Sequence, residues 1–379
     1  MNPAQALRER AVTRRTAAGV AAPPAPLPEL DHEQLAVHRG RRSGLQMAVA
    51  IHSTVLGPAL GGVRLWRYPA PIHGVADAMR LARAMTYKAA AAGLELGGGK
   101  GVICAPAGNG ATLDIGGARR RAILHDFGDL VESLDGRYVT AEDVGTGADD
   151  MATIAERTRH VTGLPVDRGG SGDPSTFTAI GVAAAMRACA ARRFGTRELA
   201  GLRVCVVGLG HVGARLARLL APAGAVLTVS DIDPAKRAVA EELGANWAEP
   251  TEALLAGCDV LALCARGGAV DRSNFTELNC AILCGAANNQ LADESLAVLL
   301  EERGVLYAPD FIANAGGLIN VYRELHGYGE ERARELALGI EETMGRILDQ
   351  ARERRMTPLA AAHELARERL DRAAAKLGR

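Results

Sequence analysis

The segment Gly97-Gly-Gly-Lys100 places one ammonium group beside three residues that have no side chain to shield it. A second lysine, Lys88, ends the run Met85-Thr-Tyr-Lys88 a short distance earlier in the chain. Two lysines in one partly closed cleft lower each other's pKa, and removal from water lowers both further. A lysine with a lowered pKa can act as a general base, whereas a lysine that stays charged can bind a carboxylate.

Two other interpretations of the glycine segment stay open. Glycines can cradle a phosphate, but the P-loop spacing G-x-x-x-x-G-K-[ST] is not met, because Leu94 occupies the first glycine position and Gly101 follows Lys100. The two lysines can also belong to the surface of a flexible loop that connects a helix to a strand.

A pair of carboxylates, Glu142 and Asp143, follows a segment, 137–140, that we expect to be a strand. Reacting groups in α/β enzymes gather at the ends of strands, so either carboxylate is a candidate for catalysis. Asp143 is an equally good candidate for the N-cap of a following helix.

The G-x-G-x-x-G pattern of a dinucleotide-binding loop occurs at Gly208-Leu209-Gly210-His211-Val212-Gly213. It follows an apolar run and opens an expected helix, whose free N–H groups favour an anion. In that setting Gly208 allows the tight turn, Gly210 lets a pyrophosphate approach, and Gly213 lets the helix pack on the sheet.

Asp231 lies roughly 20 residues beyond the glycine loop, at the end of the next expected strand. Its carboxylate can accept hydrogen bonds from the ribose hydroxyls of NAD and would repel the 2′-phosphate of NADP. The neighbouring Lys236 and Arg237 weaken that preference unless they belong to a solvated helix face. A Rossmann unit that binds no dinucleotide is the alternative.

The elements that carry these residues alternate along the chain. In the first half we expect strands at 45–51, 101–105 and 137–140 and helices at 75–92 and 119–134, which predicts a layered α/β unit. In the second half we expect strands at 203–207, 225–230, 258–263, 280–284 and 304–307 and helices at 177–194, 212–220, 234–243 and 293–303. That alternation is typical of a doubly wound parallel sheet, and helices fill the remainder from about residue 316.

The fold class is therefore α/β with two domains. We expect a substrate and catalytic domain at 31–165, completed by helices in 330–379, and a Rossmann dinucleotide-binding domain at 170–325. Residues 1–30, with an Ala/Pro-rich run at 21–26, are expected to be a disordered lead-in. Their arginines resemble those of a transit peptide, but no secretory signal is expected.

Composition excludes several classes of function. Lys+Arg and Asp+Glu both number 44, so neither nucleic acid nor a membrane surface is an expected partner. No apolar stretch is long enough to span a membrane, and the histidines form no metal-binding motif. The seven cysteines contain no C-x-x-C pair, which favours free thiols in a reducing cytoplasm over a zinc site or a disulfide framework.

The chain resembles the amino-acid dehydrogenases of the leucine, valine, phenylalanine and glutamate dehydrogenase superfamily, most closely the leucine/valine branch, over roughly residues 32 to 370. Besides the two lysine motifs, the matching segments are Ile51-His-Ser-Thr-Val-Leu-Gly-Pro-Ala-Leu-Gly-Gly62, Tyr138-Val-Thr-Ala-Glu-Asp-Val-Gly-Thr146, Gly285-Ala-Ala-Asn-Asn-Gln290 and Tyr307-Ala-Pro-Asp-Phe-Ile-Ala-Asn-Ala-Gly-Gly317. The resemblance implies reversible oxidative deamination of an L-amino acid to a 2-oxo acid and ammonia, with NAD as hydride acceptor.

The resemblance also implies roles for substrate-binding and catalytic residues. Lys88 would hold the substrate carboxylate, with help from the backbone around Gly61 and Gly62. Lys100 would be the general base that activates water for attack on the imino carbon, and Asp143 would relay protons with it. A neutral Lys100 suits this step, because a cationic iminium is disfavoured beside a charged lysine.

Further residues would contact the cofactor. On the same resemblance, Asn288 would orient the carboxylate or the nicotinamide region, Asn314 would lie beside the cofactor, and Thr178 would touch the carboxamide. Cys264 and Ala265 would lie near the nucleotide.

The side-chain pocket would be lined by Leu60, Ala141, Leu318 and Val321, which are all apolar. Glutamate would bury an unpaired carboxylate there, and the bulk of Leu318 disfavours phenylalanine. We therefore expect branched aliphatic substrates such as valine or leucine.

Four positions depart from the family pattern: Ala89 after Lys88, Arg266, His211 in the glycine loop, and Pro222. Arg266 and His211 put the choice of cofactor in doubt. The alternatives are a phenylalanine-type enzyme and a non-catalytic NAD-binding regulatory relative, although the latter would be expected to lack Lys100 or Asp143. The resemblance further implies a homo-oligomer assembled through the first domain.

Overall fold

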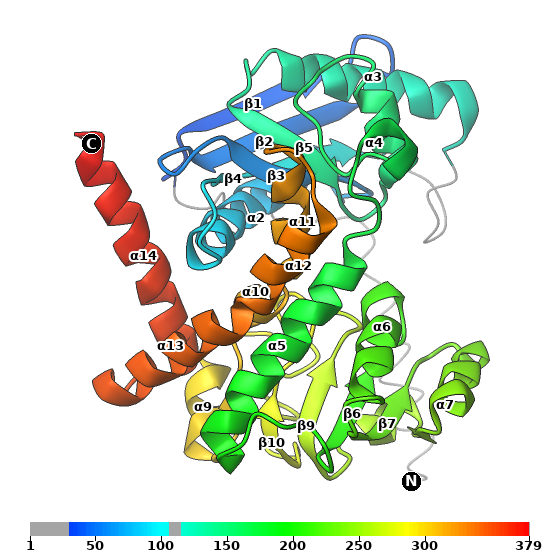
Figure 1. The fold of residues 1–379 in the computed structure, drawn as a ribbon. Helices are drawn as coiled ribbons and strands as arrows, with labels where there is room; N and C mark the ends of the chain where they lie inside the picture. The colour runs from blue at the N-terminus through cyan, green and yellow to red at the C-terminus, as the bar shows by residue number, and fades with distance from the viewer. Residues whose placement is uncertain (1–29, 106–114, 379) are drawn as a thin grey trace, which may run out of the picture.

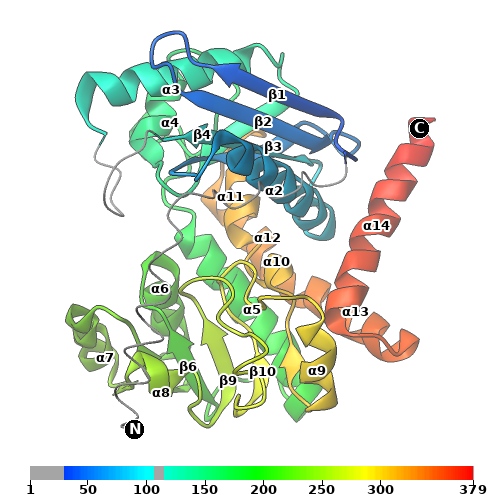
Figure 2. The same cartoon turned by 180° about the vertical axis from the view of Figure 1, so that it is seen from behind.

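The computed structural model describes residues 30–105 and 115–378, and these form two α/β units (Figure 1). The expected two-unit α/β fold is confirmed. All but the last residue of the expected lead-in, 1–30, lies outside the described residues. Figures 1 and 2 show one sheet in each unit, with α11 and α12 between the two units and α14 extending from the second unit alongside the first.

The first unit is a five-stranded mixed sheet with the order β1-β2-β4-β3-β5. Its elements are β1 (Gln34–Arg39), β2 (Gln46–Ser53), β3 (Ala59–Trp66), α2 (Pro71–Ala91), β4 (Gly97–Cys104), α3 (Gly117–Glu132), β5 (Tyr138–Glu142) and α4 (Ala148–Ile154). β2 is antiparallel to β1 and to β4, whereas β3 is parallel to β4 and to β5. The pattern of strands and helices does not predict β1, β3 or α4, and the two adjacent glycines of β3 hide its strand character.

Alternation along β2 explains how both faces of this sheet are covered. Met47, Val49 and Ile51 point into a core shared with α3 and α4, whereas Ala48 and Ala50 pack against α2. Successive side chains of a strand point to opposite faces, so one strand contributes to two cores.

The glycine–lysine segment is not a connector between a helix and a strand, as its composition predicts, but the first half of the central strand β4. A Cβ atom on Gly98 would lie 2.1 Å from the backbone nitrogen of Thr86 in α2. A Cβ atom on Gly99 would lie 2.6 Å from the ring of Tyr138 in β5. The glycines therefore let a helix and an aromatic ring pack directly on the strand, a tertiary requirement that outweighs their low strand propensity.

The second unit is a six-stranded parallel sheet with the order β11-β10-β9-β6-β7-β8, as expected for a doubly wound fold. It contains α5 (Ser175–Phe194), β6 (Arg203–Val207), α6 (His211–Leu220), β7 (Val226–Ser230), α7 (Arg237–Leu243), β8 (Asn246–Trp247), α8 (Pro250–Ala253), β9 (Cys258–Leu263), β10 (Cys280–Leu283), α9 (Leu296–Glu302), β11 (Leu306–Tyr307) and α10 (Asp310–Ala313), with short 3₁₀ helices η1 (Val166–Arg168) and η2 (Pro234–Lys236). Val204 and Val206 face α5 and α6, whereas Cys205 faces the core that includes α9. Both faces are thus buried, which explains the continuous apolar runs of these strands.

Four helices complete the chain: α11 (Gly316–Glu324), α12 (Glu330–Leu338), α13 (Ile340–Arg354) and α14 (Pro358–Lys376). We expected the segment 330–379 to return to the first domain, but α12 and α13 pack against α5, and only α14 contacts α2. Arg369 of α14 donates a hydrogen bond of 3.0 Å to the carbonyl of Ala90. Among the described helices, none is long and apolar enough to cross a membrane.

The close approach of α2 to β4 predicts that Gly98→Ala destabilises the protein. The added methyl group would overlap the backbone of Thr86, and overpacking of this kind costs about 1–3 kcal/mol. Gly345→Ala is the matched control, because nothing lies within 4 Å of its Cβ position in α13 and alanine is the better helix former. Thermal unfolding should show a lower midpoint for Gly98→Ala alone; equal midpoints would contradict the packing argument.

Candidate active site

Lys100 and Asp143 form an ion pair at the centre of the first sheet. The Lys100 Nζ atom lies 2.9 Å from Asp143 Oδ2, and only 6% of Lys100 is exposed to solvent. Lys100 comes from β4, and Asp143 directly follows β5. The interpretation of Lys100 as a surface lysine is therefore wrong. Asp143 is not an N-cap, because α4 begins five residues later with Gly147 in that position.

Arg64 completes this ion pair, although sequence patterns did not single it out. Its Nε atom donates a 2.9 Å hydrogen bond to Asp143 Oδ2, and its Nη1 atom donates one of 3.0 Å to Asp77 Oδ2. Arg64 lies on β3 two residues after Gly62, so both residues occupy the same face of that strand. The alternation of side chains along β3 could have pointed to Arg64 from the sequence. It did not, because no strand was expected at 59–66.

Burial and charge act in opposite directions on the protons of this cluster. Burial lowers the pKa of Lys100 below its usual value, although the Asp143 carboxylate opposes the change. Burial raises the pKa of Asp143, but Lys100 and Arg64 outweigh it, so the pKa is lowered overall. Asp143 thus stays ionised, and Lys100 releases its proton more readily than an exposed lysine does.

Lys88 connects the two units. Its Nζ atom donates a 2.6 Å hydrogen bond from α2 to Asn314 Oδ1 at the end of α10. The Asn314 amide in turn donates to Asn288 Oδ1 at 2.8 Å and to the carbonyl of Ala286 at 3.1 Å. Three residues proposed from separate motifs therefore form one hydrogen-bonded chain.

Burial lowers the pKa of Lys88 to about 8, and the charge of Lys100 acts in the same direction. The carboxylate of Asp310 opposes this shift. Asp310 is 7% exposed, burial raises its own pKa, and it accepts a hydrogen bond from the backbone of Gln290. Asp310 belongs to the segment 307–317, but no role follows from that motif, because nothing in the sequence indicates that its carboxylate acts on Lys88.

The four residues expected to line the side-chain pocket are all buried and belong to one apolar cluster: Leu60, Ala141, Leu318 and Val321. Leu60 and Ala141 come from the first sheet, and the other two come from α11. Gly61 and Gly62 continue β3 beside them, and a Cβ atom on Gly61 would lie 1.7 Å from the carbonyl oxygen of Gly99. Only glycine fits where β3 and β4 approach so closely.

The glycine-rich loop after β6 has the geometry of a dinucleotide cradle. Gly208 has a φ of +98°, and a Cβ atom on Gly213 would lie 1.8 Å from the Gly208 carbonyl oxygen. Nothing lies within 4 Å of the Cβ position of Gly210, the N-cap of α6. The loop therefore leaves open space at the start of a helix, where free N–H groups favour a pyrophosphate.

Asp231 lies beside this loop at the end of β7. Its Oδ2 atom accepts a 2.6 Å hydrogen bond from the backbone nitrogen of Leu209, so its carboxylate is held next to the glycines. Arg237 points elsewhere, since it pairs with Glu249 at 2.5 Å and stacks over Trp247. Of the two basic residues that weakened the preference for NAD, Arg237 is thus held by other partners.

The other residues expected near the cofactor lie at the glycine-rich loop or in the first turn of α5. Thr178 lies in that turn, close to the start of α11, because a Cβ atom on Gly317 would lie 2.6 Å from its hydroxyl. Ala265 packs against Gly208, and the neighbouring Cys264 donates its backbone N–H to Val207. His211, Val212 and the exposed Arg266 border the loop, and His211 lies 4.0 Å from Asp173.

The residues present fit NAD. The loop is open where the pyrophosphate would approach, and a carboxylate stands beside it. Asn314, at the end of α10, accepts a hydrogen bond from Lys88 of the first unit. Within the described residues no cluster of three or more histidine, cysteine, aspartate or glutamate side chains could hold a metal ion.

Comparison with known proteins agrees with this arrangement. Residues 32–160 match the family described as Glu/Leu/Phe/Val dehydrogenase, dimerisation domain, and residues 232–378 match Glutamate/Leucine/Phenylalanine/Valine dehydrogenase. Residues 181–278 match the NAD-binding domain of D-isomer specific 2-hydroxyacid dehydrogenases. NAD is therefore the cofactor of the second unit.

Individual relatives align over nearly the whole chain. Leucine dehydrogenase of Thermoactinomyces intermedius is 43% identical over 90% of this chain and 91% of its own. Valine dehydrogenase of Streptomyces virginiae is 41% identical over 89% of this chain and 94% of its own. The crystal structure of L-tryptophan dehydrogenase from Nostoc punctiforme superposes with a TM-score of 0.78, 38% identity, and coverage of 91% of this chain and 97% of that one. The chain belongs to the glutamate/leucine/phenylalanine/valine dehydrogenase family and is an amino-acid dehydrogenase.

Proposed function

We propose that this protein catalyses the reversible, NAD-dependent oxidative deamination of a branched-chain aliphatic L-amino acid to the 2-oxo acid and ammonia. One observation carries the proposal. A buried Lys100, with a lowered pKa and an ionised carboxylate 2.9 Å away, lies close enough to a second, half-buried lysine, Lys88, to lower the pKa of that lysine as well. The similarity to leucine and valine dehydrogenases supports the substrate class.

Lys88 and Asn314 are suited to bind the α-carboxylate of the substrate. In its charged form the Lys88 ammonium already donates to an amide oxygen, and a substrate carboxylate is a stronger acceptor. Because Lys88 is on α2 and Asn314 ends α10, a substrate bound here contacts both units. Binding then fixes Cα in the cleft, which is what a hydride transfer needs.

Lys100 is suited to move the protons of the reaction. NAD, when bound, accepts the hydride that leaves Cα. The neutral Lys100 amine takes a proton from water as that water attacks the imino carbon, and later returns it as ammonia departs. Asp143 holds the Lys100 amine in position and stabilises it when it is protonated, and Arg64 keeps Asp143 ionised.

The apolar cluster around Leu318 is suited to an aliphatic side chain. A buried carboxylate or ammonium would find no partner among its four pocket residues, at a cost of several kcal/mol. Leu318 also occupies volume that an aromatic ring would need. The similarity to tryptophan dehydrogenase makes an aromatic substrate the second candidate.

We further infer that the chain acts as a homo-oligomer in the cytoplasm. The family match of residues 32–160 names a dimerisation domain. An apolar groove lies beside β1 in that region, where Val37 is 53% exposed. All seven cysteines are free, as expected in a reducing compartment.

Replacing Lys100 by alanine should reduce turnover by about 10²–10⁴-fold, because it removes the general base. NAD binding, measured by calorimetric titration, should be unchanged, since the glycine loop lies on the other unit. Lys376→Ala, at the exposed end of α14, is the control and should behave as the parent enzyme. Full activity in Lys100→Ala would exclude Lys100 as the base.

The pH dependence of kcat/KM for oxidative deamination should be bell-shaped. Activity rises as Lys100 loses its proton and falls as Lys88, whose pKa is about 8, loses the charge that holds the carboxylate. Asp143 raises the pKa of Lys100, so Asp143→Asn should move the rising limb to lower pH, besides lowering the rate. An unmoved rising limb would mean that Lys100 does not carry it.

A substrate panel followed by NADH absorbance tests the pocket. The kcat/KM values for valine, leucine and isoleucine should exceed those for phenylalanine and tryptophan. The ratio should be about 10–200-fold if one or two methylene-sized contacts determine the preference. Glutamate should not react, and NAD should outperform NADP because of Asp231. Leu318→Ala should shift the ratio towards phenylalanine. A parent enzyme that prefers aromatic substrates would instead favour the second candidate.

A further inference from the structure

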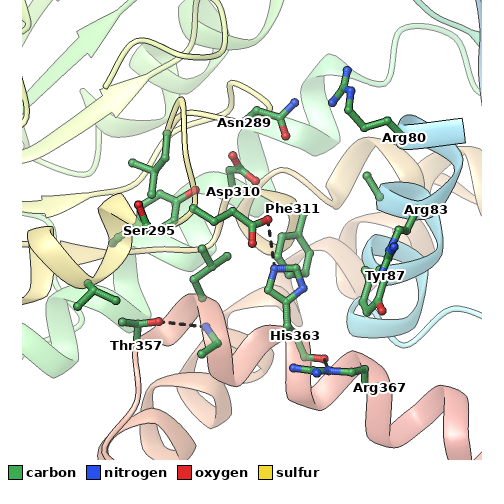
Figure 3. Close-up of a pocket in the computed structure, with 17 residues that line it drawn as sticks. Arg80, Arg83, Tyr87, Asn289, Ser295, Asp310, Phe311, Thr357, His363 and Arg367 are labelled. Atoms are coloured by element: carbon green, nitrogen blue, oxygen red, sulfur yellow. Dashed lines mark hydrogen bonds and ion pairs between the residues drawn. The ribbon is translucent and has the colours of Figure 1, made fainter. Parts of the chain in front are cut away.

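A cavity lies between α2, α14 and the segment from Asn289 to Phe311 (Figure 3). Its volume is about 830 Å³, enough for a small organic molecule. The proposed reaction does not use it. Neither Lys100, Asp143 nor the glycine-rich loop lines it.

This cavity shares its walls with the candidate active site. Tyr87 lines the cavity, and its neighbour Lys88 binds Asn314. Asn289 also lines the cavity, and its neighbour Asn288 accepts a hydrogen bond from Asn314. The carboxylate of Asp310 borders the cavity and acts on the charge of Lys88. A molecule in the cavity therefore contacts the immediate neighbours of the residues proposed to bind substrate.

The backbone at one of these walls is strained. Asn289 has a φ of +52°, one of three non-glycine residues with positive φ in the described part of the chain. This conformation costs free energy and is maintained by its surroundings. A contact with Asn289 is thus well placed to alter the position of Asn288.

The cavity has one cationic group without an anionic partner among the described residues. Arg80 and Arg83 line it but pair with Asp77 at 2.7 Å and Asp31 at 3.0 Å. Within the part of the chain that the structure describes, the only hydrogen bond of Arg367 is a weak one, 3.4 Å long, to the backbone carbonyl of His363. Its guanidinium is therefore available for a carboxylate.

One side of the lining suits an apolar body, although the lining also holds the carboxylate of Glu294, which lies 3.5 Å from His363. The ring of His363 lies 5.5 Å from that of Tyr87 and 5.1 Å from that of Phe311, so three rings from α2, α14 and α10 stand side by side. Leu291, Val298 and Leu359 add aliphatic surface. Figure 3 shows Tyr87, His363 and Phe311 grouped near Arg367.

We propose that this cavity binds a small organic anion, a carboxylate attached to an apolar body, and that its occupancy changes substrate binding through Lys88 and Asn288. Arg367 binds the carboxylate, and the ring cluster and the aliphatic residues contact the body. The binding step is independent of the reaction, whereas the coupling rests on the proposed role of Lys88.

Calorimetric titration with 4-methylpentanoate tests the binding step. This probe has no amino or oxo group and cannot react, and Lys88→Ala removes its binding at the active site. In that background we expect one remaining site, weakened about tenfold or more by Arg367→Ala, because a charge-assisted hydrogen bond is lost. Arg372→Ala is the matched control, since Arg372 lies on the same helix and also binds the carbonyl four residues earlier.

Either of two results would overturn the site: no binding in Lys88→Ala, or equal binding in Arg367→Ala and Arg372→Ala. Inorganic phosphate serves as a second probe, and a cavity that binds phosphate but not 4-methylpentanoate would also contradict the proposal. The coupling is tested by inhibition of the otherwise unmodified enzyme. We expect mixed inhibition of the unmodified enzyme and purely competitive inhibition of Arg367→Ala. The same pattern of inhibition in these two enzymes would refute the coupling but would not affect the binding result.

Discussion

The ion pair of Lys100 and Asp143 is the contact on which the site depends. A lysine buried to 6% exposure is costly unless a carboxylate accompanies it, and here the carboxylate is held by Arg64 as well. β4 begins with three glycines, which let α2 and Tyr138 pack against the strand without intervening side chains. This close packing accommodates the ion pair. The same absence of side chains that lowers the strand propensity of β4 thus allows the close packing around the buried Lys100 amine.

The two units meet through a shared apolar cluster and through polar contacts around Lys88. The chain from Lys88 through Asn314 to Asn288 links α2 to the nucleotide-binding unit, and the C-terminal helix α14 adds a second link through Arg369. In the proposed reaction, a substrate that replaces the contact between Lys88 and Asn314 would alter this link between the units. The cavity lined by Tyr87 and Asn289 borders the same contacts, which makes this junction a natural place for control.

Much of the architecture was predictable, and the errors have physical causes. Strands β6 and β9 coincide with the predictions for 203–207 and 258–263, because buried parallel strands are uninterrupted apolar runs. The strand β3 was missed and β4 was begun too late, since glycines carry no apolar pattern. The helices α12 and α13 were assigned to the wrong partner, because a helical pattern identifies an apolar face but not the surface that covers it.

The sequence by itself determined the types and chain order of the groups involved: two lysines, a carboxylate after a strand, a glycine loop before a helix, and an acidic residue beyond it. These are local patterns, and local physical chemistry suffices to interpret them. Only the tertiary structure decided that Arg64 shares Asp143, that Asp310 faces Lys88, and that Arg237 turns away from Asp231. These interactions are made between residues of different elements. The distances between their side chains result from tertiary packing and cannot be deduced from the spacing of the residues along the chain.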